Sequence, residues 1–263
     1  MIASTLRTEI PAMPASRVLL AYLAEARYES MRMLRAPAFA VPFLVLPVAV
    51  YLLFGVVMAG DEIAKNPRVA DFLFLGFCVM AVMGPALFGM GCTLAVERDA
   101  GLLKLKRALP APPGAYLLAK FAMGMFFAAV AMALMIGTAA IAGKIGLDAG
   151  QLAVASAVLV VGSVPFCAIG LFIGAHCSGG LAPAIANLIY LPMLWLSGIF
   201  IPLPGLMQKL VVIWPAFHLD QLAIHAIGLE GFQFMPPTMS FAVLLGVTLV
   251  CGGAAIRRLA RKG

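Results

Sequence analysis

The sequence predicts an all-α integral membrane protein with six transmembrane helices, an amphipathic interface helix near the N-terminus and outer re-entrant helices before the last span. Two observations predict this fold class. Hydrophobic residues make up 63% of the 263 residues, only 11% are charged, and the mean hydropathy is +1.07. A soluble globular domain does not need so much apolar surface, so the composition excludes that class. The few charges flank long uncharged intervals, at residues 36–60, 72–96, 121–143, 149–208 and 231–256.

Residues 1–35 are expected to form a cytoplasmic tail and then an amphipathic helix that lies in the membrane interface. Helical spacing separates an apolar face from a polar face between residues 17 and 35. The apolar face contains Leu19, Leu20, Leu23, Met31 and Leu34, and the polar face contains Glu25, Glu29, Arg32 and Arg35.

The predicted transmembrane domain covers residues 36–256. A helix needs about 20 apolar residues to cross the hydrocarbon region, so most of the uncharged intervals hold one span each. The interval 149–208 is long enough for two spans, with a turn near residues 178–180. The predicted spans are about 38–59, 72–96, 116–142, 151–176, 182–202 and 236–256.

The basic residues predict how these helices are oriented. Most of the 18 Lys and Arg residues lie in the N-terminal segment, in the loop after the second span or in a basic tail at 257–263. Only Lys65, Arg68, Lys144 and Lys209 lie on the other side. The positive-inside rule therefore places both termini and the central loop in the cytoplasm. Because the net charge of +7 is divided among short flanking segments, it does not predict a nucleic-acid partner.

A charged loop at 97–113 separates the second and third spans and has the features of a coupling element. A helix that begins at Gly101 has an apolar face formed by Leu102, Leu105 and Leu109, and Lys104 and Arg107 lie on the opposite face. Prolines at 110, 112 and 113 end this helix before the next span. We expect Glu97 to hold the end of the second span through Arg98 or a helix N-terminus. A soluble partner that gripped this loop would move both spans.

Residues 203–230 form the predicted outer re-entrant hairpin. The segment is apolar, but prolines at 202, 204 and 215 interrupt it, so two short interfacial or re-entrant helices are expected. Its polar residues Lys209, His218, Asp220 and His225 are expected to be partly in contact with water. The last three could form a metal site or a proton relay, but interfacial polar residues are the favoured interpretation.

Other motifs narrow the function without defining a catalytic site. The segment 137–144 resembles a phosphate loop but has five residues between its glycines instead of four, and Ile145 replaces the Ser or Thr. Any ATP and Mg²⁺ must therefore bind another polypeptide. The five cysteines lie in apolar runs without a Cys-x-x-Cys motif and predict no metal. Gly170 and Gly174 form a Gly-x-x-x-Gly motif that favours close helix packing, within the protomer or across a dimer.

Two local patterns resemble the ABC-2 type permeases, which are membrane subunits of ATP-driven exporters. One is Glu97-Arg98-x-x-Gly101, followed by a leucine-bearing helix, a proline and Lys120 at the start of the third span. The other is Leu196-Ser197-Gly198-x-Phe200-x-Pro202, followed by Pro215 after a short helix. The resemblance covers nearly the whole chain. This chain departs from the first pattern, since Leu102 replaces the usual Thr and Lys104 the usual acidic residue.

The resemblance implies two copies of this subunit together with two copies of a separate ABC ATPase that carries ATP and Mg²⁺. It also implies that the 97–109 loop docks in a groove of the ATPase. The residues that it implies at an outer gate or exit are Trp195, Ser197, Gly198, Phe200, Pro202 and Pro215. Interfacial anchoring is an equally good explanation for the two aromatic residues in this set.

The predicted function is outward transport of an amphiphilic small molecule, drug or lipid-like substrate across the inner membrane of a bacterium. The chain by itself is then not an enzyme, and its partners are the ATPase, a second copy of itself and membrane lipids. A secondary carrier or channel is an alternative, but no predicted span has an Asp, Glu, Lys or Arg at its centre. A membrane scaffold for a soluble partner is the other alternative.

Overall fold

The computed structural model describes residues 14–60, 66–108, 114–143, 145–200 and 207–262. Every regular element in these ranges is a helix. The elements are α1 (Ala15–Leu34), α2 (Pro37–Val50), the π-helix η1 (Tyr51–Met58), α4 (Arg68–Asp99), α5 (Leu102–Ala108), α6 (Ala115–Ala142), α7 (Ala149–Val161), α8 (Val164–His176), α9 (Ala182–Leu196), α10 (Met207–Leu210), the 3₁₀ turn η2 (Val211–Ile213), α11 (Pro215–Ala226) and α12 (Pro237–Lys262).

Within the described residues, five helical segments are long and apolar enough to cross a membrane. They are Pro37–Met58, Arg68–Asp99, Ala115–Ala142, Ala149–His176 and Pro237–Arg261. The all-helical membrane class is therefore confirmed. The predicted span at 182–202 is represented by α9, which has 15 residues and ends at Leu196, so it is shorter than a typical crossing. The count of six spans stays a prediction.

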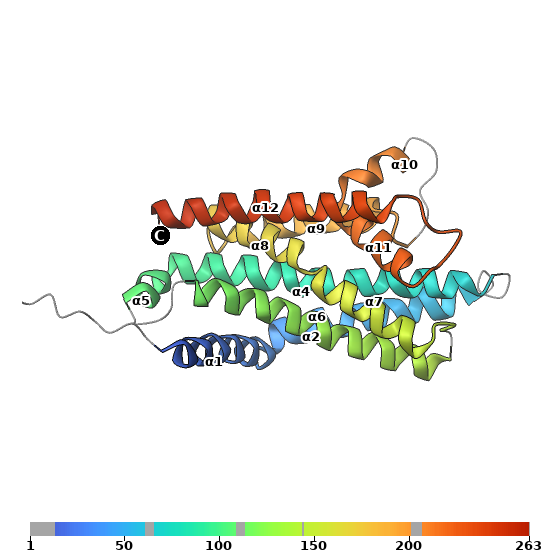
Figure 1. Cartoon of the computed structure of the whole chain (residues 1–263), viewed down its shortest axis with the longest axis horizontal. Helices are drawn as coiled ribbons and strands as arrows, with labels where there is room; N and C mark the ends of the chain where they lie inside the picture. Colours follow the sequence, from blue (N-terminus) through green and yellow to red (C-terminus); the bar gives the residue numbers. More distant parts are fainter. Residues whose placement is uncertain (1–13, 61–65, 109–113, 144, 201–206, 263) are drawn as a thin grey trace, which may run out of the picture.

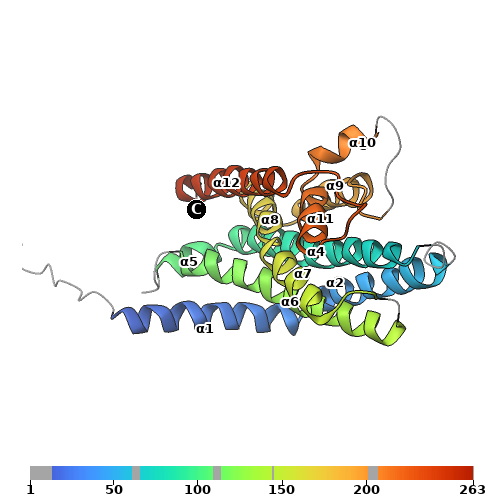
Figure 2. The ribbon, with the colours of Figure 1, turned by 45° about the vertical axis from the view of Figure 1, so that its right-hand side comes forward.

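Helix α4 is the centre of the bundle. It contacts α6 and α8 most extensively and also packs against α2, α9 and α11 (Figures 1 and 2). Small residues allow the closest approach, because a Cβ atom at Gly170 of α8 would lie 2.4 Å from the carbonyl oxygen of Leu87. A Cβ atom at Gly174 would lie 2.7 Å from the carbonyl oxygen of Gly91. The Gly170 and Gly174 motif thus faces α4 of the same chain.

The predicted span at 151–176 is built from two helices, α7 and α8. The break falls at Gly162 and Ser163, and Pro165 in the first turn of α8 has no N–H with which to continue the α7 hydrogen bonds. Helix α11 packs against this break, since a Cβ atom at Gly162 would lie 2.1 Å from a methyl carbon of Leu219. The break therefore makes room for α11.

Helix α1 has the two predicted faces, but its orientation differs from that of an ordinary surface helix. The leucines of its apolar face are exposed, whereas Glu29 of its polar face is buried with Met33. Helix α1 contacts α6 over much of its length. It is foreshortened in Figure 1 and drawn longer in Figure 2, while α12 changes in the opposite sense, so α1 crosses the direction of the long helices. Its leucines thus face outward, whereas Glu29 faces inward.

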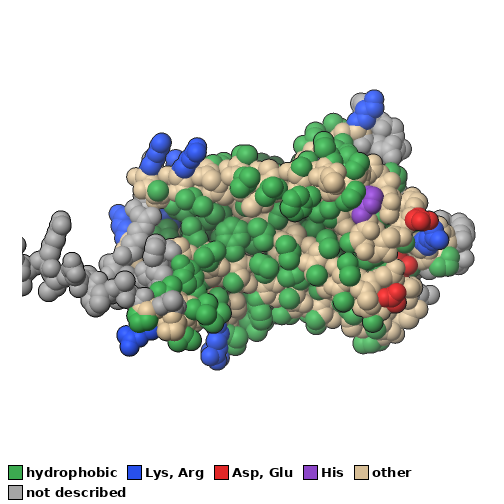
Figure 3. Space-filling view, in the orientation of Figure 1, with side chains coloured by type: hydrophobic (Ala, Val, Ile, Leu, Met, Phe, Trp, Pro, Cys, Tyr) green, Lys and Arg blue, Asp and Glu red, His purple; other side chains and the backbone are tan. Residues whose placement is uncertain are grey.

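The two ends of the molecule differ in charge. The start of α1, helix α5 and the C-terminal end of α12 lie at one end, and α10 and α11 lie towards the other (Figure 1). Figure 3 shows hydrophobic side chains over the middle of the visible face, with Lys and Arg at the α5 end. Both acidic and basic side chains appear at the opposite end of this face. This distribution matches a membrane-spanning bundle with a basic end.

Candidate coupling site and Asp220 cavity

The predicted coupling segment turns away from α4 at Gly101. The φ of Gly101 is +74°, a left-handed conformation that glycine adopts without steric cost. In the helix that follows, Leu103 is buried against the core, while Leu102 and Leu105 are 41% and 62% exposed. Two of the three leucines predicted for the apolar face are therefore presented at the surface.

The other predicted residues of this segment have different positions. Lys104 is exposed. The side chain of Arg107 and all of Leu109 lie outside the described part of the structure. Lys106 donates a hydrogen bond of 2.5 Å to Glu25 of α1, so α5 is joined to α1 as well as to α4.

Arg98 fixes the end of α4 to the end of α8. Its guanidinium donates to the carbonyl oxygens of Gly174, Ala175 and Cys177, at 3.0, 2.6 and 2.8 Å. These carbonyls lie at the C-terminal end of α8, where a cation is favoured because the helix leaves its last carbonyls unpaired. The carboxylate of Asp99 accepts from the backbone N–H of Gly179 at 2.7 Å. The loop after α8 is thus tied to the base of α5.

Glu97 binds different partners from those that we predicted. Among the described residues, it pairs with neither Arg98 nor a helix N-terminus. Its carboxylate accepts hydrogen bonds from Arg32 at 2.5 Å, from Lys120 at 3.3 Å and from the Tyr116 hydroxyl. The prediction was wrong because it assumed that the polar face of α1 was in water, whereas that face packs on α6 and supplies Arg32.

A second carboxylate completes a group of four charges, which we call the Glu97 cluster (Glu29, Arg32, Glu97 and Lys120). Lys120 is 0% exposed and Glu29 is 1% exposed, and the ammonium donates to the Glu29 carboxylate at 2.5 Å. Lys120 also donates to the Thr93 hydroxyl at 2.8 Å. Two cations balance two anions, so the cluster is formally neutral. It joins α1, α4 and α6 at the end of the bundle next to α5.

At the opposite end, several of the predicted exit residues lie close together after α9. Ser197 is buried at the end of α9, and Gly198 follows it with a φ of +71°. The Phe200 ring packs against Phe77 of α4, with 4.5 Å between the ring centroids. Trp195 is exposed and contacts Phe200 edge to face.

Two prolines of the predicted exit set have different outcomes. Pro215 begins α11 at a position that does not need a backbone N–H donor. Pro202 lies outside the described residues.

His218 and Asp220 of α11 are buried, although we expected them to be partly in contact with water. The expectation holds for Lys209, which is exposed, and for His225, which is partly exposed. His218 contacts the Val212 carbonyl oxygen at 2.9 Å and the Ser240 hydroxyl at 3.3 Å. Gln221 bonds to the backbone of the 232–235 segment, and His225 contacts the Met235 carbonyl oxygen at 2.7 Å. Because backbone groups satisfy these side chains, α11 can pack into the bundle. Burial lowers the pKa of His218, which favours its neutral form.

Asp220 does not follow this pattern. It is 2% exposed, and none of the described residues donates a hydrogen bond to its carboxylate. Burial raises the pKa of Asp220 well above its usual range. In the described part of the chain, no group of three or more His, Cys, Asp or Glu side chains could hold a metal ion.

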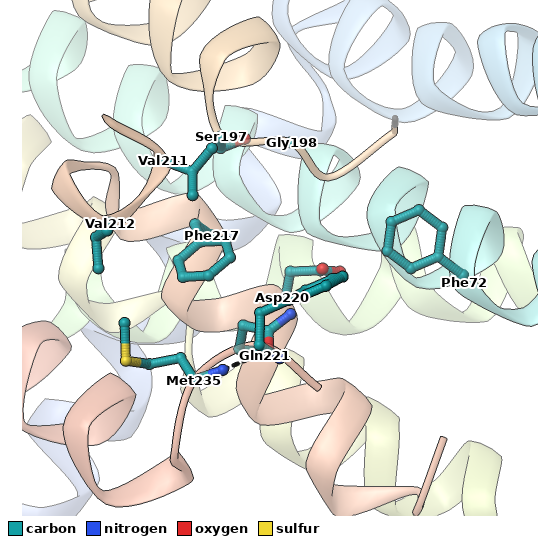
Figure 4. Close-up of a pocket in the computed structure, with 10 residues that line it drawn as sticks. Phe72, Ser197, Gly198, Val211, Val212, Phe217, Asp220, Gln221 and Met235 are labelled. Carbon is teal, nitrogen blue, oxygen red and sulfur yellow. Dashed lines mark hydrogen bonds between the residues drawn. The ribbon is translucent and has the colours of Figure 1, made fainter. Parts of the chain in front are cut away.

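Asp220 lines a cavity of about 190 Å³ at this end of the molecule. Figure 4 shows the cavity between α4, α11 and the end of α9, with the Asp220 carboxylate extending from α11 in the direction of Phe72. Ser197 and Gly198 of the predicted exit set form part of its wall. No sequence pattern indicates this cavity directly, because its walls come from segments far apart in the chain.

Long apolar helices around a buried central helix define an all-helical membrane protein, with a surface helix at one end and a cavity at the other. A family model described as an ABC-2 type transporter matches residues 21–224, and the chain belongs to this family. It is similar to a protein of Bacillus subtilis (strain 168) described as "Putative transport permease YvfS". The two are 25% identical over 193 residues, which cover 72% of this chain and 78% of the relative. Members of the family are transport subunits that are not themselves catalytic and generally work with an ATPase subunit.

Proposed function

We propose that this chain is the membrane-spanning subunit of an exporter that is driven by a separate ABC ATPase, and that α5 is the element to which the ATPase binds. The observation that carries the proposal is the exposed pair Leu102 and Leu105 on a helix between two spans. Exposed leucines on a short helix beside basic side chains have the character of a docking surface. Lys104 and Arg107 would meet acidic groups at the rim of the ATPase groove.

The attachments of α5 support a mechanical role. Leu103 anchors α5 to the core, and a single glycine turn separates α5 from α4. Arg98 holds the same end of α4 to α8, and the Glu97 cluster holds it to α1 and α6. A displacement of α5 by a closing ATPase would therefore move several helices together and would not bend one loop alone.

The proposed complex contains two copies of this chain and two copies of the ATPase, which bind ATP and Mg²⁺. The basic end of the bundle, with both termini, would face the cytoplasm of a bacterium, and the chain would lie in the inner membrane. The concentration of Lys and Arg at the α5 end supports this orientation. Apolar helices around α4 are compatible with an amphiphilic substrate. Trp195, Ser197, Gly198 and Phe200 would form part of the outer exit.

Co-purification of the tagged full chain with its ATPase tests the proposal. The variant Leu105→Glu places a charge in the middle of the exposed apolar face, and we expect it to reduce recovery of the ATPase at least tenfold, since a charge is costly in an apolar interface. Arg261→Glu, on the exposed end of α12, adds an acidic side chain at the same end of the molecule and should not reduce recovery. Equal recovery with the wild type and Leu105→Glu would exclude α5 as the docking element.

A further inference from the structure

Asp220 is a buried acid whose role is not explained by packing. A buried polar group without a hydrogen bond is costly, and a buried charge without a partner is more so. The neighbouring polar side chains of α11 all have backbone partners, but the Oδ1 atom of Asp220 is fully buried and has none among the described residues. The carboxyl group is therefore either a destabilising feature of the fold or a group that meets a ligand.

The surroundings of this carboxyl group favour the ligand. Asp220 is the one charged side chain among the described residues that line the cavity. Phe72 of α4, Phe217 of α11 and Phe234 of the following loop contribute phenyl rings to the same walls. Gln221, the other strongly polar lining residue, already uses its amide in bonds to the backbone. The cavity thus combines a single free carboxyl group with aromatic walls (Figure 4).

This combination has a specific chemical preference. A metal ion needs several ligands. Among the described residues, Asp220 does not belong to any group of three or more His, Cys, Asp or Glu side chains that could hold one. An organic ammonium group needs one counter-ion and is attracted to the faces of aromatic rings. The volume of about 190 Å³ is smaller than a typical drug site and suits a compact head group.

We propose that this cavity binds a small organic cation, with the Asp220 carboxylate as its counter-ion and the rings of Phe72, Phe217 and Phe234 around its apolar part. Burial raises the pKa of Asp220, so the empty cavity favours the protonated acid, and a bound cation supplies the charge that favours the carboxylate. The inference goes beyond the proposed function, because it concerns binding by this chain alone and requires no ATPase.

Calorimetric titration of the purified full chain in detergent tests the inference with two matched probes. Choline carries a trimethylammonium group, and 3,3-dimethyl-1-butanol is its neutral isostere with carbon in place of nitrogen. We expect saturable binding of choline and at least tenfold weaker binding of the alcohol, because charge attraction is strong in an apolar cavity. Asp220→Asn keeps the shape of the side chain, removes the charge, and should weaken choline binding about tenfold or more.

Two further variants make the test specific. Glu230→Gln removes an acidic group from the exposed surface near α11 and should leave choline binding unchanged. Phe234 is half exposed, so Phe234→Leu should fold normally and should weaken choline binding about threefold without affecting the alcohol. If Asp220→Asn is not monodisperse, the Phe234→Leu comparison decides. The inference is overturned by no saturable choline binding, by equal affinity for the two probes, by a folded Asp220→Asn chain with wild-type affinity, or by a Phe234→Leu chain with wild-type affinity for choline.

Discussion

At the scale of single residues, the Glu97 cluster shows how this chain places ions inside an apolar bundle. Each of its buried charges has an opposite charge within hydrogen-bonding distance, and the cluster is neutral as a whole. Taking Glu29, Glu97 and Lys120 out of water still costs free energy, so the cluster contributes specificity of docking more than net stability. Its position fixes how α1, α4 and α6 meet.

Removal of one charged residue of the Glu97 cluster should strongly destabilise the folded chain. In the variant Lys120→Met the carboxylates of Glu29 and Glu97 lose a buried partner, and we expect the free energy of unfolding to fall by about 3–5 kcal/mol. Thermal unfolding of the purified chain in detergent measures this change.

Two controls separate the effect of burial from the loss of a positive charge. Lys104→Met removes an exposed lysine from α5 and should change the stability by less than about 0.5 kcal/mol. The double variant Lys120→Met with Glu29→Gln removes a buried cation together with a buried anion and should recover most of the loss. A double variant as unstable as Lys120→Met alone would show that the ion pairs are not the cause.

Sequence patterns identified some members of this cluster but not their pairing. Glu97 was predicted to hold the end of the second span through Arg98 or a helix N-terminus. Its contact with Arg32 joins residues 65 apart, and the contact of Lys120 with Glu29 joins residues 91 apart. Such contacts depend on how separate helices dock, and amphipathic spacing alone does not reveal that the polar side of a helix faces the protein. In a membrane, lipid would contact the apolar side of α1.

At the scale of elements, the packing of α8 on α4 depends on the absence of side chains at two positions. A Cβ atom at Gly170 or Gly174 would overlap with backbone carbonyl oxygens of α4, which cannot move aside as a flexible side chain can. Without a hydrophobic effect between helices in lipid, such close backbone contact is a main source of association.

A methyl group at this contact should separate the two helices. We expect Gly170→Ala to lower the free energy of unfolding by about 1–3 kcal/mol through overpacking. Gly137→Ala in α6 is the matched control, since a Cβ atom there has no neighbour within 4 Å and alanine favours the helix. Thermal unfolding of the two variants provides the comparison. If both lost the same stability, close packing of α8 on α4 would not explain the effect.

Hydropathy predicted the elements better than their interruptions. Five predicted spans coincide with long apolar helical segments, because length and apolar composition determine which segments can cross a bilayer. Pro165 gave a signal for the break between α7 and α8, but the uncharged run around it suggested a continuous helix. The burial of α11 was not predictable, since its histidines are satisfied by backbone groups of segments that only the fold brings near.

At the scale of the whole molecule, α4 connects the two proposed sites. Phe72, near its first turn, lines the Asp220 cavity, and Glu97, near its last turn, belongs to the cluster beside α5. Its 32 residues correspond to a length of roughly 48 Å, which exceeds the thickness of the hydrocarbon core. A continuous helix of this length, buried along most of its course, is suited to carry a displacement from the basic end to the opposite end.

The central claim is that an ATPase acts on this chain through α5, and ATP hydrolysis by the reconstituted complex tests it most directly. The rate of ATP hydrolysis is measured for three samples: the ATPase alone, the ATPase with the wild-type chain in lipid nanodiscs, and the ATPase with the Leu105→Glu chain in lipid nanodiscs. The ATPase concentration is one that saturates the effect of the wild-type chain. We expect the wild-type chain to change the rate severalfold and Leu105→Glu to return it to the rate of the ATPase alone. The same rate with the wild-type chain and with a correctly inserted Leu105→Glu chain would contradict the account.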